Sequence, residues 1–337
     1  MIPLLTRPPA FGKLDVNRNT HIPAGSAPPI STEMSASAPQ GMRRAWCLCA
    51  HGEDDLMALI AVLADLHFDS WTRWAVDPLT AQGLDIVIHK RRPDLLVIAG
   101  DVANDPVRNW PGILSRLGRL IAPEKIVIVP GNHDYYGFRL DGEHILREMC
   151  SSAGVRFAQK EELRVGTTRV ICSTLWTDFA LNGDVRVATE VAARVMNDYR
   201  QIRTGAVAGL PFDHQGTRPI TPRDTLALHL DHRRWLEAAL REPHFAGPEG
   251  KTIVVTHHGP SRSTAVGEID DLTPSFHSNL HELILQTQPD AWFFGHSHRR
   301  CGAQVGRTVI RNVSLGYPEE LGTHALELGP LIFFETD

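Results

Sequence analysis

The sequence predicts a mixed α/β fold with two sheets, and the order of its apolar segments is the basis for this prediction. Short apolar runs rich in β-branched residues, such as 125–129, are typical of buried strands. In the first half of the chain these runs alternate with segments that have helical spacing, whereas strands dominate toward the end. A single doubly wound sheet would keep the alternation throughout, so we expect a layered fold with two sheets.

Three strands and three helices are expected in the first half of the chain. The strands are the short apolar runs at 56–64, 94–99 and 125–129. Helical spacing predicts helices at 81–90, 109–121 and 141–151. Pro93 ends the first of these helices, and Pro111 lies in the first turn of the second, where proline is tolerated.

The second half is predicted to contain more strands than helices. We expect short strands at 155–157, 162–165 and 169–174, followed by a helix at 184–199. A polar, proline-rich loop then leads to Pro222, and Thr221 or Asp224 begins a helix that ends at Leu240. The remaining elements are a helix at 278–286 and strands at 252–256, 291–294, 303–305, 308–313 and 325–334.

Residues 1–56 differ in composition from the rest of the chain. They contain two Pro-Pro pairs and a Ser/Ala/Pro cluster, and they show no hydrophobic periodicity. This composition is typical of disordered segments. We therefore expect a disordered leader over 1–56 and a single folded domain, carrying any catalytic site, over 57–337. The first ten residues contain no apolar core of signal-peptide length, which argues against secretion.

Composition argues against several classes of protein. The net charge of −5 and the absence of a basic run longer than Lys90-Arg91-Arg92 argue against nucleic-acid binding. Five cysteines without a CxxC pair argue against a disulfide framework and a thiolate zinc site, and they indicate a reducing, cytoplasmic compartment. No apolar run approaches the ~20 residues that a membrane-spanning helix needs.

The candidate functional residues follow directly after predicted strands. Their segments are Asp65-Leu66-His67, Gly100-Asp101, Gly131-Asn132-His133-Asp134, His257-His258 and Gly295-His296-Ser297-His298. Each segment alone has an ordinary explanation as a polar turn. Together they indicate a metal site, because they offer carboxylates, imidazoles and one amide without thiolates. Such ligands suit one or two divalent cations such as Mn, Fe or Zn.

This series of motifs resembles the calcineurin-like binuclear metallophosphoesterase superfamily, in particular a bacterial type that acts on small substrates. The resemblance extends from residue 58 to about residue 300. It implies a β-sandwich of two sheets flanked by helices in four layers, with two divalent ions at the carboxyl ends of the strands. It also implies hydrolysis in which a hydroxide that bridges the ions attacks phosphorus.

Carried over by position, the resemblance assigns each polar residue a role. Asp65, His67 and His298 would bind the first ion, and Asp101 would bridge. Asn132, His257 and His296 would bind the second ion, with His257 preferred to His258 because it directly follows the strand. His133 would act as a general acid or as a charge partner of the phosphoryl group, and Asp134 would orient His133.

Further residues resemble the bacterial type more loosely. The candidate substrate-binding residues are His258, Asn197, Tyr199 and Tyr317. The alternative is that the aromatic residue at 199 packs in the core and that Asn197 caps a helix. Other histidines are expected on solvated helix faces or loops, namely His214, His229, His232, His277 and His281.

The sequence thus predicts a metal-dependent hydrolase of phosphoric esters that acts on a small-molecule phosphomonoester or phosphodiester, without nucleic-acid or membrane partners. Three alternatives remain open: a nuclease-type phosphodiesterase, a protein with this fold that has lost catalysis, and a binuclear hydrolase of carbon esters or amides.

Overall fold

The computed structural model describes residues 46–48, 58–205, 216–320, 322 and 327–336. The chain divides into two compact units, Met1–Arg43 and Arg44–Asp337, and every described residue belongs to the second. The predicted leader over 1–56 lies outside the described residues except for Trp46–Leu48. These three residues form strand β1, which pairs in parallel with strand β6 (Glu161–Val165). The boundary at residue 57 otherwise stays a prediction.

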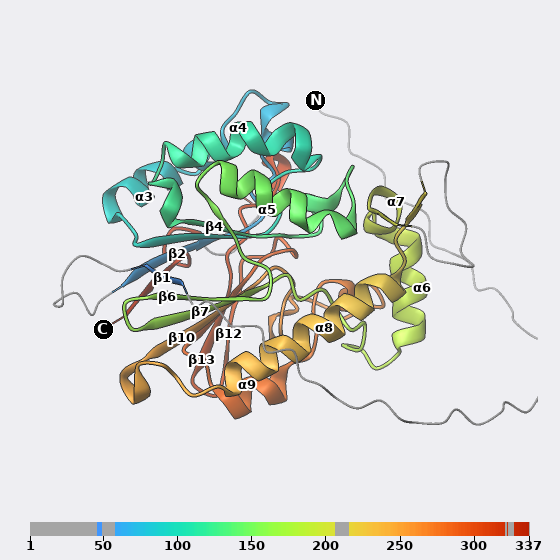
Figure 1. Ribbon diagram of the computed structural model, residues 1–337. Coiled ribbons are helices and arrows are strands. Elements are labelled where there is room, and N and C mark those ends of the chain that lie inside the picture. Colours follow the sequence, from blue (N-terminus) through green and yellow to red (C-terminus); the bar gives the residue numbers. More distant parts are fainter. Residues whose placement is uncertain (1–45, 49–57, 206–215, 321, 323–326, 337) are drawn as a thin grey trace, which may run out of the picture. The chain divides into compact units, whose positions relative to one another are not determined.

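Two large sheets flanked by helices form the second unit, and this confirms the predicted fold class (Figure 1). Three helices lie on the outer face of one sheet, namely α3 (Leu84–Arg91), α4 (Pro106–Gly118) and α5 (Glu143–Ser152). Helices α8 (Pro222–Arg241) and α9 (His281–Thr287) lie on the outer face of the other sheet. Each sheet is therefore covered by helices on its outer face and by the other sheet on its inner face.

The first sheet has five strands in the order β14-β2-β3-β4-β5. Strands β2 (Leu59–Leu63), β3 (Leu95–Ala99), β4 (Ile126–Val129) and β5 (Arg156–Phe157) are parallel, and β14 (Phe333–Glu335) is antiparallel to β2. Every residue of β3 and β4 is buried. Continuous apolar runs are expected for parallel strands that are covered on both faces, so the sequence of these strands matches their position.

The second sheet has seven strands in the order β1-β6-β7-β10-β11-β13-β12. Its parallel strands are β7 (Thr168–Ser173), β10 (Lys251–Thr256), β11 (Ala291–Phe294) and β13 (Thr308–Asn312). Strand β6 is antiparallel to β7, and β12 (Gly302–Val305) is antiparallel to β13. The carboxyl ends of the parallel strands in this sheet thus point to one edge.

Several predicted elements differ from the structure. The helix predicted at 109–121 begins at Pro106, so Pro111 lies inside α4 rather than in its first turn. The helix predicted at 184–199 is interrupted where Met196 is extended, which gives α6 (Val185–Val195) and α7 (Asp198–Gln201). The predicted loop up to Pro222 contains the antiparallel pair β8 (Arg203–Gly205) and β9 (Thr217–Pro219). Of the strand predicted at 325–334, the first two residues lie outside the described residues, and among the described ones the strand is β14.

Backbone hydrogen bonds join the two sheets where their strands end. Ala64, directly after β2, donates its N–H to the carbonyl of Val313 at 3.1 Å and accepts from the N–H of Leu315 at 2.8 Å. Val313 and Leu315 follow β13 of the other sheet. This link brings the polar residues after strands of both sheets to one edge of the sandwich.

The start of α8 is stabilised by an ionised side chain. The Asp224 carboxylate accepts hydrogen bonds from the backbone N–H of Thr221 at 2.7 Å and from Arg218 Nη2 at 2.6 Å. Burial alone would raise the pKa of Asp224, but these bonds outweigh it and hold the pKa below its usual value. The ionised form of Asp224 therefore contributes to folding.

Asp224→Asn is expected to lower the free energy of unfolding by about 1 kcal/mol at pH 7. The loss should shrink as the pH falls below about 4, because the unfolded carboxyl titrates near pH 3.9 and the folded one below it. Urea unfolding of both proteins at pH 7 and pH 3 measures this. An equal difference at the two pH values would contradict the prediction.

Candidate metal centre

Polar side chains from both sheets meet at the edge where the parallel strands end. Asp65 and His67 follow β2, and Asp101 follows β3. His257 follows β10, and His296 follows β11. The structure therefore brings together residues that are far apart in the sequence, at the carboxyl ends where they were predicted to meet.

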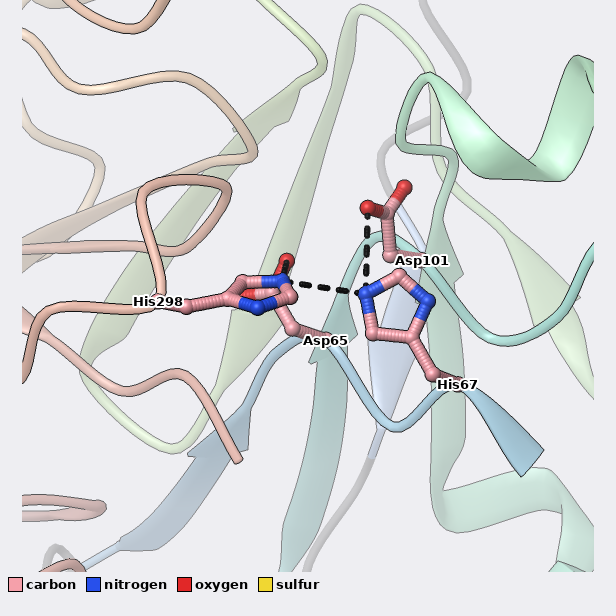
Figure 2. A group of neighbouring side chains, drawn as sticks. All are labelled: Asp65, His67, Asp101 and His298. Carbon is pink, nitrogen blue, oxygen red and sulfur yellow. Dashed lines mark hydrogen bonds and ion pairs between the residues drawn. The ribbon is translucent and has the colours of Figure 1, made fainter. Parts of the chain in front are cut away.

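One group of four possible ligands consists of Asp65, His67, Asp101 and His298, whose ligand atoms all lie within 4.8 Å of one another (Figure 2). The Nε2 atoms of His67 and His298 face each other at 3.0 Å. His67 Nε2 lies 3.6 Å from Asp101 Oδ2, and His298 Nε2 lies 3.4 Å from Asp65 Oδ1. Four donor atoms that converge in this way can share one cation.

A second group consists of Asp101, His257 and His296, again with ligand atoms within 4.8 Å of one another. His257 Nε2 lies 3.4 Å from Asp101 Oδ1 and 2.9 Å from Asn132 Oδ1. Asp101 belongs to both groups and offers a different oxygen to each, since Oδ2 faces His67 and Oδ1 faces His257. The assignment of individual ligands stays a prediction.

The donor set fits divalent metal ions. Asp101 Oδ2 and His296 Nε2 are buried and have no hydrogen-bond partner among the described residues. Buried polar atoms are almost always paired, so an unpaired Asp101 oxygen that faces His67 Nε2 at 3.6 Å indicates a missing partner. Carboxylate oxygens and imidazole nitrogens without thiolates suit Mn, Fe or Zn.

Burial dominates the electrostatics of the cluster. Burial, together with the neighbouring carboxylates of Asp65 and Asp134, raises the pKa of Asp101 well above its usual value. Burial also lowers the pKa of three histidines, His67, His257 and His296. A histidine binds a metal in its neutral form, so these three imidazoles are held in the ligating state.

His298 differs from the other histidines because two carboxylates surround it. Burial would lower its pKa, but Asp65 and Glu320 raise the pKa to about 10. His298 Nδ1 lies 2.8 Å from Glu320 Oε2, which leaves Nε2 directed at the cluster. A carboxylate on the distal nitrogen commonly orients a metal-binding histidine. The sequence reasoning did not identify Glu320.

Five of the predicted ligands have a left-handed backbone. Their φ angles are 56° at Asp65, 40° at His67, 57° at Asp101, 66° at His296 and 49° at His298. Residues other than glycine rarely adopt this conformation, which costs about 1–3 kcal/mol at each position. Such strain tends to gather at functional sites, and here it falls on residues of the candidate cluster.

Three glycines allow the cluster to pack closely. A Cβ atom on Gly131 would collide with the Asp101 carboxylate, and one on Gly295 would collide with Asp65. A Cβ atom on Gly100 would collide with the ring of His257, and Gly100 also has a φ of 90°. The glycines that begin three of the five polar segments therefore give the ligands room.

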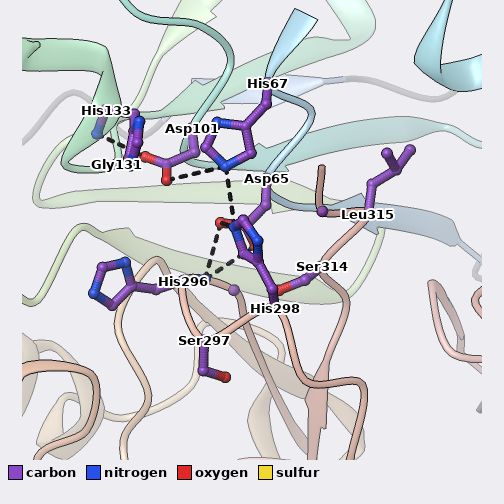
Figure 3. Close-up of polar contacts among 12 residues, drawn as sticks. Asp65, His67, Asp101, Gly131, His133, His296, Ser297, His298, Ser314 and Leu315 are labelled. Atoms are coloured by element: carbon purple, nitrogen blue, oxygen red, sulfur yellow. Dashed lines mark hydrogen bonds and ion pairs between the residues drawn. The ribbon is translucent and has the colours of Figure 1, made fainter. Parts of the chain in front are cut away.

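His133 lies beside the cluster. The prediction that Asp134 contacts and orients its side chain does not match the structure. The backbone N–H of His133 donates to Asp101 Oδ1 at 2.8 Å (Figure 3). Its side-chain Nδ1 lies 2.8 Å from Asn104 Oδ1, not beside Asp134. Asn104 is thus the residue that holds the imidazole.

Asp134 instead binds the backbone of two strand ends. Its carboxylate accepts N–H hydrogen bonds from Asp101, Val102, Ala103 and Gly131 at 2.8–3.2 Å. Residues 133–135 form a short 3-10 turn, which directs the side chains of His133 and Asp134 to different surroundings. Burial raises the pKa of Asp134 to about 7, although the four hydrogen bonds oppose this shift.

The predicted substrate residues Asn197 and Tyr199 flank Asp198 in the sequence, and it is Asp198 that contacts the cluster, through Asn132. Asp198 is buried and accepts hydrogen bonds from Asn132 Nδ2 at 2.7 Å and from the Tyr136 hydroxyl at 2.9 Å. Asn197 is exposed, and the Tyr199 hydroxyl contacts Thr225 at 3.2 Å. These contacts favour the structural alternative for Tyr199 and add Asp198 as an orienting residue. Asn197 stands at the start of α7, but its side chain forms no capping hydrogen bond.

The other two predicted substrate residues lie against the cluster. The Tyr317 ring stacks on His67 with 4.3 Å between centroids, and its hydroxyl lies 3.4 Å from His133 Nε2. The His258 ring lies 4.2 Å from that of His296, and its Nδ1 lies 3.3 Å from the carbonyl oxygen of Thr174. Substrate contact by either residue stays a prediction.

Three histidines that were predicted to be solvated are buried. His229, His232 and His277 have 0%, 2% and 3% of their surface exposed. His229 and His232 lie on the face of α8 that packs inward, and His229 Nδ1 is 3.2 Å from the carbonyl oxygen of Leu175. His281 is exposed, as predicted, and His214 lies outside the described residues.

Comparison with known proteins identifies a family. The family model described as calcineurin-like phosphoesterase matches residues 58–300. Uncharacterized protein L509 of Acanthamoeba polyphaga mimivirus is 23% identical over 242 residues, which cover 67% of this chain and 79% of that protein. Among the described residues, no helix has the length and hydrophobicity needed to span a membrane.

Solved structures with the same fold include phosphopantetheinyl hydrolase of Mycobacterium tuberculosis, at a TM-score of 0.57 and 17% identity. The match covers 80% of this chain and 93% of that one. A dimetal phosphatase from Danio rerio matches at a TM-score of 0.46 and 12% identity, over 76% of this chain and 87% of that one.

Gly131→Ala is expected to weaken metal binding by at least about tenfold, because the new methyl group would displace the Asp101 carboxylate. Isothermal titration calorimetry with Mn²⁺ or Zn²⁺ measures the affinity. Gly112→Ala is the matched control, since its Cβ would meet no atom within 4 Å. Equal affinity in both variants, with circular dichroism showing that both are folded, would contradict the prediction.

Proposed function

The chain belongs to the calcineurin-like phosphoesterase family, and from this premise we propose that it hydrolyses phosphoric esters with two divalent ions bound at the candidate metal centre. The observation that carries the proposal is the position of Asp101, whose two oxygens face two separate groups of buried ligands. A carboxylate shared in this way is typical of sites that hold two ions a few ångströms apart.

The proposed ligands divide between the two ions. Asp65, His67 and His298 would hold one ion, Asn132, His257 and His296 would hold the other, and Asp101 would serve both. When bound, the ions would act as Lewis acids that activate water and neutralise charge on the phosphoryl oxygens. Glu320 and Asp198 would keep His298 and Asn132 in place through the hydrogen bonds described above.

His133 would stabilise charge on the substrate. Burial and the nearby imidazoles lower its pKa to about 3, so the ring is neutral at pH 7. In the observed arrangement Asn104 Oδ1 accepts a hydrogen bond from His133 Nδ1, which places the ring proton on Nδ1. A 180° turn of the Asn104 amide would present its NH2 group to Nδ1 instead and would place the proton on Nε2. With its proton on Nε2, the neutral ring would donate a hydrogen bond to a phosphoryl or leaving oxygen rather than act as a general acid.

The proposed substrates are small-molecule phosphomonoesters or phosphodiesters. The net charge of −5 disfavours a polyanionic nucleic acid. Three described cysteines, Cys150, Cys172 and Cys301, are free, which supports the further proposal of a reducing, cytoplasmic compartment.

Metal reconstitution followed by a substrate screen tests the activity. We expect the metal-loaded protein to hydrolyse p-nitrophenyl phosphate or bis-p-nitrophenyl phosphate and to leave p-nitrophenyl acetate intact. Asp101→Ala should lower kcat by more than about 100-fold because both ions lose a ligand. Glu148→Ala, on an exposed face of α5, is the control. Activity retained in Asp101→Ala, or restricted to the acetate ester, would reject the proposed function.

Two variants test whether Asn132 binds metal while the neighbouring His133 acts on the substrate. His133→Ala should keep the metal content and lose most of the turnover, because His133 is assigned to the substrate. Asn132→Ala should weaken one of the two metal sites, because its side-chain oxygen lies 2.9 Å from His257 Nε2. Metal content by inductively coupled plasma mass spectrometry and kcat are measured together. Equal metal loss in both variants would show that the roles are assigned wrongly.

A further inference from the structure

A groove of about 710 Å³ lies between helices α1 (Phe68–Thr72) and α4. Along the chain, both helices follow closely after proposed metal ligands. Helix α1 starts directly after His67, and α4 starts five residues after Asp101. Residues from α1 and the turn that follows it form one wall. Residues along the length of α4 and at its two ends form the other. The groove therefore begins at segments that carry two of the proposed ligands.

Asn104 connects this groove to the catalytic residues. It lines the groove, and its side-chain oxygen lies 2.8 Å from His133 Nδ1. Its backbone N–H donates to Asp69 Oδ1 at 3.2 Å, and Asp69 also lines the groove. Because His133 is assigned to the substrate oxygens, a substrate held at the metal centre could extend past Asn104 into the groove.

The groove contains two exposed arginines, and the charge of one of them, Arg73, partly offsets the burial that raises the pKa of Asp69. Arg73 and Arg108 are exposed, and within the described part of the chain their side chains form no hydrogen bond or ion pair. In contrast, the third arginine, Arg116, is paired with Asp77 at 2.7 Å. Arg108 also lies in the first turn of α4, where the helix dipole favours an anion.

The charges of the groove indicate what it would bind. Four arginines line it, Arg73, Arg108, Arg116 and Arg119, together with three aspartates, Asp69, Asp77 and Asp105. Pairing of Arg116 with Asp77 leaves an excess of positive charge, while the remaining carboxylates can accept hydrogen bonds from hydroxyl or amide groups. Arginine is the side chain best suited to bind a phosphate through two parallel hydrogen bonds.

We infer that this groove binds a second anionic group of the substrate, remote from the phosphorus that is attacked. The inference rests on the proposed function and names its substrate class: phosphoesters whose alcohol carries a further phosphate on a polar linker. Arg73 and Arg108 bind that phosphate, and Asn104 lies along the path between the two anions. A monoester without the second anion leaves both arginines in solvent.

Phosphonates test the groove without turnover, because their carbon–phosphorus bonds are not esters. We would titrate the full metal-loaded chain with alkane-α,ω-diphosphonates of two to six carbons and with the matching alkyl monophosphonates, by isothermal titration calorimetry. One diphosphonate length should bind at least about tenfold tighter than its monophosphonate, the effect of roughly one charge-assisted hydrogen bond. Arg73→Ala and Arg108→Ala should remove that gain.

Arg241→Ala is the control, since Arg241 is exposed at the end of α8 on the opposite side of the sandwich (Figure 1). No gain at any length, or a gain that survives in both arginine variants, would overturn the inference. A gain that depends on the arginines in a protein that hydrolyses no phosphoester would keep the groove and reject the proposed function. Hydrolysis of simple phosphoesters, without tighter binding of any diphosphonate, would keep the proposed function and reject the groove.

Discussion

The Asp134 carboxylate is the interaction on which the candidate centre depends. Its two oxygens accept N–H groups from residues 101–103 and from Gly131, and these are the ends of the neighbouring strands β3 and β4. Residues leaving a strand would otherwise need water to satisfy their backbone donors. By accepting these hydrogen bonds, Asp134 satisfies the donors within the protein and fixes the backbone of Asp101, the residue shared by both ligand groups.

The strained backbone of the cluster follows from the same arrangement. Five predicted ligands have positive φ angles because each strand must turn sharply to aim its side chain at a common point between two sheets. The links between Ala64 and the chain after β13 hold the sheets at the distance where this is possible. The rest of the sandwich, packed and apolar, supplies the stability that such strain requires.

The sequence predicted the two-sheet fold and the residues that converge, because both depend on local patterns. Apolar β-branched runs mark β3 and β4, and polar residues at their ends must share one edge of a parallel sheet. Hydrogen-bond partners that only the tertiary structure brings close were not predicted. Glu320 and Asn104 come from other segments, and the resemblance assigned Asp134 an orienting contact with His133 that the 3-10 turn prevents. The burial of His229 depends on how α8 packs.

The facing pair His67 and His298 has a consequence for folding. These residues are 231 positions apart, so the first group of ligands cannot assemble until β2 and the segment after β11 have found each other. Closing so large a loop is entropically costly and favours slow folding. A chain that has folded only its first sheet would lack His298, and one that has folded only its second sheet would lack Asp65, His67 and Asp101. Metal uptake would therefore report the last stage of folding, and free metal would draw the chain toward its native state by mass action.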